Sequence, residues 1–291
     1  MNKPATVRIA IESALCLLVP LFAFKCLSFV PWREYEFTRL YLSTMVGTGA
    51  ALLCLMSLVR LQLVERAVWY GFVASVVTVL LVTKRGSVAT PSPNAGPQLM
   101  QFIIVLVVNA ALLFGGSCCG MLLALRIRRS SFLIMTALVT CLADTYSVWY
   151  GPTGKLVEEH AELVAPRTML HWFALGHDLA FPFMGVGDLL FLSLFFCGAR
   201  RYGFDARANV TTQLAALAVA YAIIIGETLA ENPVRLAGLM FIGPAFLVVN
   251  WGRFELDRND KRGLACAVAG LTLGLVALIV LQQTFGWLKP D

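Results

Sequence analysis

The chain has 291 residues, of which 59% are hydrophobic and only 14% are charged, and it carries a formal net charge of +6. A mean hydropathy of +0.78 excludes an ordinary soluble domain. The apolar stretches run for about 17–25 residues, the length that an α-helix needs to cross ~30 Å of hydrocarbon. The sequence therefore predicts an all-α fold, a polytopic bundle of transmembrane helices that forms a single integral membrane domain over residues 1–291.

About nine spans are expected in chain order, joined by short connections: 9–30, 40–59, 67–83, 99–125, 131–150, 179–198, 208–229, 234–250 and 264–285. We group them as N-terminal helices (1–129), a central set (130–250) and one further C-terminal span (264–285). If the loops alternate sides, fourteen Lys and Arg lie on the side of the N-terminus and eight lie opposite. This bias predicts a cytoplasmic N-terminus and an outside C-terminus, in the plasma membrane of a prokaryote. Because the basic residues serve as topology signals, no nucleic-acid partner is expected.

Metal and redox sites find no support in the sequence. None of the eight cysteines shows CxxC or Cys/His ligand spacing. All three histidines lie between 151 and 178 without the spacing of a known metal site. We expect no metal and no cofactor, and we interpret this connection as an amphipathic stretch at the membrane interface, with Trp172 and Phe173 as anchors.

Two acids stand inside apolar spans, Asp144 in 131–150 and Asp188 in 179–198. A carboxylate in hydrocarbon costs several kcal/mol, so it usually has a function or a partner. At 1.5 Å per residue, Asp144 lies ~22 Å along a helix from Arg129 and Asp188 lies ~18 Å from Arg200. The depths agree within one helical turn, so antiparallel neighbouring spans would bring the two carboxylates face to face.

Two carboxylates at close range do not both ionise readily, so they share a proton. Such a pair suits amide hydrolysis, in which one acid activates water and the other polarises the carbonyl. Paired intramembrane acids also serve as relays in proton- or ion-coupled transporters. The pair by itself supports both functions equally.

The residues around the acids resemble one family. Gly185-Val-Gly187-Asp188 is similar to the GxGD signature of the presenilin and signal peptide peptidase family of intramembrane aspartyl proteases, and Asp144 resembles the first aspartate of that family. Gly243-Pro-Ala-Phe246 resembles the family's Pro-Ala-Leu motif. The resemblance covers residues 130–250. It implies a presenilin-like bundle and an endopeptidase that cuts transmembrane segments of other membrane proteins, with Asp144 and Asp188 as catalytic residues.

The same motifs predict where the substrate binds. Gly185 and Gly187 leave room for an incoming chain, because they carry no side chain. Pro244 lacks a backbone donor and is expected to interrupt its helix, which would let freed backbone groups pair with an unwound substrate. Pro244, Ala245 and Phe246 are therefore expected to bind substrate together with the two glycines.

A second family also uses two aspartates with GxGD, the prepilin peptidases. They typically carry a basic residue just after the second acid, whereas no basic residue follows Asp188 before Arg200. A prepilin-peptidase-like protease and a transporter that uses the same acids as a relay remain the alternatives to the presenilin-like protease.

Overall fold

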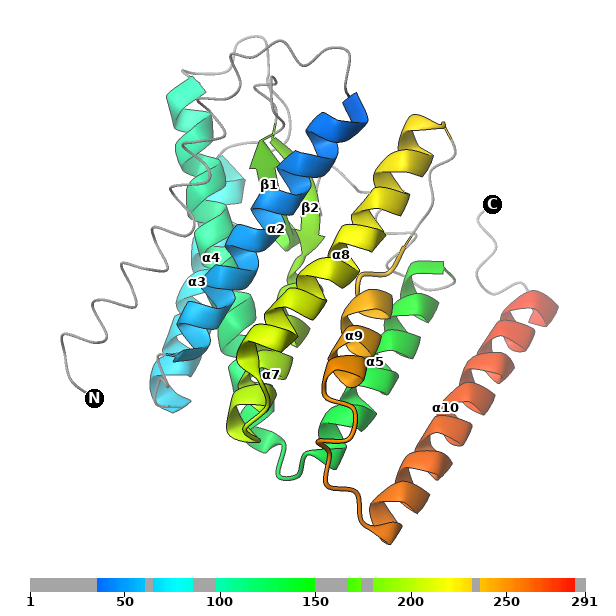
Figure 1. Ribbon diagram of the computed structural model, residues 1–291. Coiled ribbons are helices and arrows are strands. Elements are labelled where there is room, and N and C mark those ends of the chain that lie inside the picture. Colours follow the sequence, from blue (N-terminus) through cyan, green and yellow to red (C-terminus); the bar gives the residue numbers. More distant parts are fainter. Residues whose placement is uncertain are drawn as a thin grey trace.

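The computed structural model describes residues 36–60, 65–85, 98–149, 167–173, 180–231 and 236–285, which form a helical bundle around a small β-hairpin (Figure 1). In chain order the elements are α2 (Glu36–Arg60), α3 (Glu65–Arg85), α4 (Gln98–Arg126), α5 (Ser131–Trp149), β1 (Met169–Phe173), β2 (Ala180–Gly185), α7 (Val186–Arg201), α8 (Ala206–Leu229), α9 (Leu239–Val249) and α10 (Arg258–Phe285).

The prediction of a helical membrane protein agrees with this architecture. Among the described residues, five helices are long and apolar enough to cross a membrane, judged by length and composition. They are Glu36–Arg60, Glu65–Thr83, Ile103–Arg126, Ser131–Trp149 and Ala206–Leu229. The expected first span, 9–30, lies outside the described residues, and the total of nine stays a prediction.

Two expected spans are shorter as helices than the sequence pattern indicated. The span predicted over 179–198 begins as strand β2 and becomes helical only at Val186. In the span predicted over 234–250, the described residues begin at 236 and are helical from Leu239 to Val249. Hydropathy does not distinguish a buried strand from a helical segment, because both are continuous apolar runs. Helices α7 and α9 are therefore shorter than the ~30 Å of a bilayer core.

The hairpin lies against α2 and α4 and leads directly into α7. Its antiparallel strands pair Met169 with Gly185 and Leu170 with Met184, with a bulge after Leu170. The side chain of Asn109 on α4 binds the hairpin backbone, accepting from the His171 N–H (2.9 Å) and donating to the His171 carbonyl (2.6 Å).

This arrangement corrects the prediction that Trp172 is an interfacial anchor; of the connection 151–178, only residues 167–173 are among those the structure describes. Trp172 is only 2% exposed and packs edge-on against Phe183, with ring centroids 6.3 Å apart. Gly47 on α2 makes room for it, since a Cβ there would lie 2.9 Å from Trp172 Cδ2. The indole is part of the core because strand pairing turns it inward.

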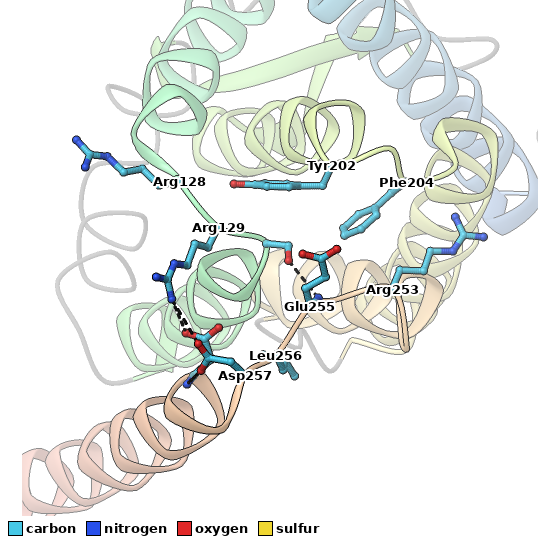
Figure 2. Close-up of a pocket in the computed structure, with 10 residues that line it drawn as sticks. Arg128, Arg129, Tyr202, Phe204, Arg253, Glu255, Leu256 and Asp257 are labelled. Carbon is cyan, nitrogen blue, oxygen red and sulfur yellow. Dashed lines mark hydrogen bonds and ion pairs between the residues drawn. The ribbon is translucent and has the colours of Figure 1, made fainter.

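Helix α10 diverges from the bundle and is joined to it near its first turn (Figure 1). Arg129, between α4 and α5, forms ion pairs with Asp257 at 3.7 Å and Asp260 at 3.5 Å, and Ser130 Oγ accepts the Glu255 N–H at 3.3 Å (Figure 2). Because the two pairs are partly exposed, each is worth at most about 1 kcal/mol.

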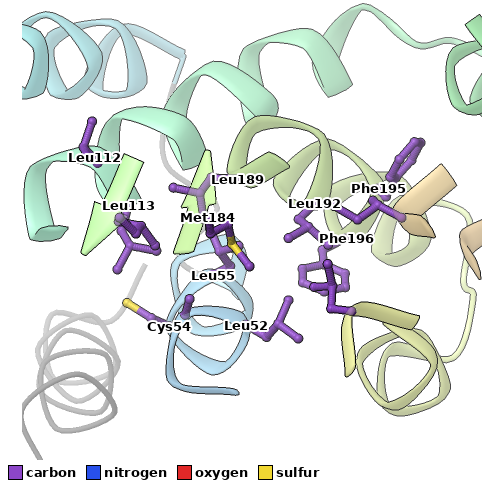
Figure 3. Packing of buried hydrophobic residues seen from close by; sticks show 14 of the residues in the cluster. Leu52, Cys54, Leu55, Leu112, Leu113, Met184, Leu189, Leu192, Phe195 and Phe196 are labelled. Atoms are coloured by element: carbon purple, nitrogen blue, oxygen red, sulfur yellow. The ribbon is translucent and has the colours of Figure 1, made fainter. Parts of the chain in front are cut away.

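The hydrophobic core surrounds α7. Side chains from α2, α4, β2 and α7 meet there, among them Leu55, Leu113, Met184, Leu189 and Leu192 (Figure 3). Because these side chains come from four elements, the core holds the start of α7 in place.

Helices α4 and α7 approach closely through a Gly-x-x-x-Gly pair, Gly116 and Gly120. A Cβ on Gly120 would collide with the Leu190 carbonyl and lie 2.7 Å from Ser193 Cβ, and a Cβ on Gly116 would lie 3.0 Å from Leu189 Cβ. Small residues of this kind let membrane helices pack backbone to backbone. The position of α7 therefore depends on the absence of side chains on α4.

Polar side chains tie α8 to α9. Buried Gln213 donates to the Ile242 carbonyl at 3.0 Å, and Asn209 and Asn250 exchange two hydrogen bonds at 3.1 and 2.8 Å. Asp205 caps α8 by accepting the backbone N–H groups of Ala208 and Arg207, and these bonds lower the pKa of its carboxyl group.

We predict that Gly120→Ala destabilises the fold by about 1–3 kcal/mol, because the new methyl group forces α4 away from α7. Thermal unfolding of the detergent-solubilised protein measures the change. Gly49→Ala in α2 is the matched control, since a Cβ there meets nothing within 4 Å. The control is expected to be neutral or slightly stabilising, and equal unfolding temperatures for the two variants would contradict the close packing of α4 and α7.

Candidate active site

Asp188 lies in the first turn of α7, where β2 ends. Its Oδ2 accepts the N–H of Gly185, the N-cap residue, at 3.2 Å. This is the second half of a capping box, in which the third helical residue reaches back to the N-cap amide. The carboxylate is half-buried. Its orientation is therefore set by the start of its own helix.

Asp144 lies on α5 and is also half-buried. Its Oδ2 accepts the backbone N–H of Leu239, the first residue of α9, at 3.1 Å. The first amides of a helix have no partner within that helix, and its dipole favours a negative charge at this end. The bond therefore joins α5 to the start of α9 across 95 positions of sequence.

The two carboxylates converge on adjacent residues. Asp188 packs against Gly238, where a Cβ would lie 2.8 Å from Asp188 Cγ and 2.9 Å from Oδ2, and Asp144 binds Leu239. Because Gly238 and Leu239 are neighbours in the chain, the two carboxylates lie close to each other. The structure thus brings together the two acids that the sequence pairs, around the residues 238–239.

The route by which they meet differs from the expected one. We predicted that the spans of Asp144 and Asp188 would be direct neighbours along their length. In the structure α5 packs mainly along α9, and α7 packs mainly along α4. Helices α5 and α7 touch at Leu133 and Gly198, where a Cβ on Gly198 would lie 2.7 Å from Leu133 Cδ2. At the level of the acids, the start of α9 contacts both.

The predicted Pro-Ala-Phe element lies farther along α9. Pro244 is exposed and stands inside an uninterrupted helix, so the expected helix break at this proline is wrong. It lies ~7.5 Å along the helix from Leu239. Ala245 is buried, and Phe246 is fully buried and stacks on Phe195 at 4.5 Å between ring centroids. A role for these three residues in binding substrate stays a prediction.

Gly238 and Leu239 were missed by the sequence reasoning. The sequence offered no local signal for them, because only the structure shows that the helix begins at Leu239 and has eleven residues, too few to span a bilayer. Such a helix begins within the bundle, and its first amides need an acceptor. The glycines of the GxGD motif, by contrast, do not fill tight space: a Cβ on Gly185 would be 3.4 Å from Asp188 Oδ2, and one on Gly187 would meet nothing within 4 Å.

One sizeable cavity among the described residues lies apart from the acids. A cavity of about 580 Å³ is lined by Tyr202, Phe204, Glu255 and the Arg129 ion pairs (Figure 2). It opens where α5 begins, ~20 Å along α5 from Asp144. Within the described ranges, no three His, Cys, Asp or Glu side chains form a group that could hold a metal ion. His160 and His177 lie outside those ranges.

Two carboxylates that sense each other's charge can hold one proton between them, so that one acts as a base while the other donates a hydrogen bond. A water molecule or an amide carbonyl placed between them would meet both groups at once.

Comparison with models of protein families, with characterised proteins and with solved structures finds no match to this chain.

We predict that Asp144→Ala accelerates hydrogen exchange at the Leu239 amide by about tenfold or more, because a hydrogen bond to a charged acceptor is lost. Asp144→Asn is expected to have a smaller effect, since the amide oxygen still accepts. Exchange is followed by mass spectrometry on the peptide that contains 236–242. Asp260→Ala, which removes an acid at the start of α10, serves as the control. Unchanged exchange at Leu239 in Asp144→Ala would show that the bond does not protect α9.

Proposed function

We propose that this protein is an intramembrane aspartyl endopeptidase that hydrolyses peptide bonds within transmembrane segments of other membrane proteins, with Asp144 and Asp188 as its catalytic pair. The observation that supports this function best is the convergence of both carboxylates on Gly238 and Leu239. Two acids from distant helices approach one point inside an apolar bundle, where each would be costly without a role.

The chemistry follows from a pair that holds a single proton. The ionised carboxylate takes a proton from water, and the hydroxide oxygen bonds to the carbonyl carbon of the substrate amide. The protonated carboxyl group donates a hydrogen bond to the carbonyl oxygen as negative charge develops there. When the C–N bond breaks, a proton passes to the leaving nitrogen, and the pair returns to its starting state.

The surroundings of Asp188 provide a path for an extended substrate. Strand β2 runs directly into α7, and Gly187 is exposed beside the carboxylate. One edge of β2 pairs with β1. Several backbone groups of β2 are already engaged: the Phe183 carbonyl accepts from Tyr221 at 3.0 Å, and the Gly185 N–H donates to Asp188. We therefore assign the binding of an unwound substrate segment to the exposed backbone at Gly187, which brings a scissile amide to the acids.

The decisive test is cleavage of a transmembrane peptide by the purified full-length protein in lipid. Asp144→Asn and Asp188→Asn are each expected to lower the rate by at least about 10²-fold, because each removes one half of the acid–base pair while keeping a hydrogen-bond acceptor for α9 or Gly185. Asp205→Asn, at an exposed acid outside the site, should cleave at the wild-type rate.

Two results would count against the protease. If wild-type protein cleaves no transmembrane peptide yet moves protons across liposomes in a manner that needs both acids, the relay function replaces it. If both Asn variants cleave normally, the hydrolysis comes from other residues.

A second variant tests the geometry of the site. We predict that Gly238→Ala lowers cleavage by about 10²-fold, since a methyl group there displaces the Asp188 carboxylate. A displacement of about 1 Å in a catalytic group can lower the rate of reaction by this factor. Pro244→Leu, at an exposed position farther along α9, is expected to change the rate much less. Folding of both is checked by thermal unfolding. A Gly238→Ala protein as active as wild type would exclude a catalytic arrangement built around this contact.

A further inference from the structure

A groove opens between α3, α4 and α7, and its lining reaches Gly187, the residue directly before Asp188. Its volume is about 440 Å³, and its lining is almost wholly apolar, with Val76 and Leu80 from α3, Leu112 from α4, and Gly187 and Leu190 from α7. The volume is within the range of ligand sites in proteins, which are typically apolar with a few polar groups that orient the ligand.

The groove is hollow for a structural reason. Gly187 contributes no side chain, and a Cβ there would meet nothing within 4 Å. Val76 and Leu80 are 41% and 54% exposed, so the groove is open on the face that α3 presents outward. Helix α3 is one of the candidate membrane spans, so this face borders the acyl chains of the bilayer.

Two polar residues that precede β1, Arg167 and Thr168, also line the groove. The Arg167 Nε donates to Thr83 Oγ1 at 3.4 Å, which holds the guanidinium group at the end of α3. Thr83 is the last residue of the candidate span Glu65–Thr83, so Arg167 contacts the end of that span. From Leu80 to Phe72 the α3 lining runs ~12 Å into the span.

We propose that this groove binds one acyl chain of an anionic phospholipid, whose phosphate pairs with Arg167. A guanidinium group binds phosphate through two parallel hydrogen bonds, and basic residues at helix ends recognise lipid headgroups. A phospholipid places its phosphate at the membrane surface and its acyl chain directly beneath, which matches the order of Arg167 and the apolar lining. The groove shares Gly187 with the substrate path proposed above, but the lipid is held without Asp144 or Asp188, so this proposal does not rest on the peptidase function.

The probe is phosphatidylglycerol with a diazirine in one acyl chain, mixed at low mole fraction into phosphatidylcholine nanodiscs that hold the full-length protein. After irradiation, cross-linked residues are mapped by mass spectrometry. Labelling is expected to concentrate on the groove segments of α3 and α4. Leu273 and Val276 of α10, which are also exposed, report the background from bulk lipid.

Matched variants separate the site from general lipid contact. Leu80→Trp fills the groove and should lower its labelling about fivefold, whereas Leu81→Trp, at a neighbouring position that is 58% exposed and does not line the groove, should leave it unchanged. Arg167→Gln should reduce the preference for phosphatidylglycerol over an identical phosphatidylcholine probe by about fivefold, and Arg167→Lys should restore part of it. Asp188→Asn should label like wild type, so failure of the peptidase proposal leaves this result intact.

Several results would overturn the proposal. These are groove labelling no stronger than that of α10, equal labelling of Leu80→Trp and wild type, or equal labelling by the anionic and zwitterionic probes. A diazirine fatty acid that labels the groove as strongly as phosphatidylglycerol would overturn the assignment to a phospholipid.

Discussion

Backbone amides at the start of a helix have no acceptor within that helix, and inside an apolar bundle there is no bulk water to supply one. Helices α7 and α9 both begin in such surroundings, next to the buried side chains of Met184 and Leu239. Asp188 supplies an acceptor at the start of α7, and Asp144 supplies one at the start of α9. This requirement sets the positions of both carboxylates, and much of the bundle is arranged around these two helix starts.

The same carboxylates therefore have a structural role in addition to the proposed catalytic one. An acid that accepts a backbone amide is held in a defined orientation, which is what a general acid or base needs. It follows that alanine at Asp144 or Asp188 removes a hydrogen bond and a reactive group together. Asparagine separates the two effects, because its carboxamide oxygen still accepts a hydrogen bond but cannot exchange a proton in the same way.

Helix α7 packs closely against α4 and also borders an open groove. Gly116 and Gly120 let α4 approach its backbone, while Gly187 leaves a groove toward α3. The hairpin before α7 is anchored from three elements: Asn109 on α4 binds its first strand, Tyr221 on α8 donates to the Phe183 carbonyl at 3.0 Å, and Gly47 on α2 admits Trp172. These contacts fix the position at which α7, the helix that carries Asp188, begins.

Hydropathy alone was enough to predict the membrane class and helices α2 to α5 and α8, because about 20 apolar residues in succession have few alternatives to a helix. It failed for 179–198 and 234–250, where part of an apolar run forms a strand or no helix at all. Such a run is apolar whether it is helical or extended. In 179–198, pairing with β1 decides between the two. The burial of Trp172 depends on that same pairing.

For the candidate site, the sequence by itself determined which residues are the candidates for the proposed chemistry, since two acids in apolar spans and a GxGD motif are visible without coordinates. Only the tertiary structure decided what lies between them. The contact of Asp188 with Gly238 and the bond of Asp144 to Leu239 join segments far apart in the chain, and neither has a local sequence pattern. A backbone amide is the same in every residue except proline, so the sequence cannot show which one a carboxylate will meet until packing brings the two together.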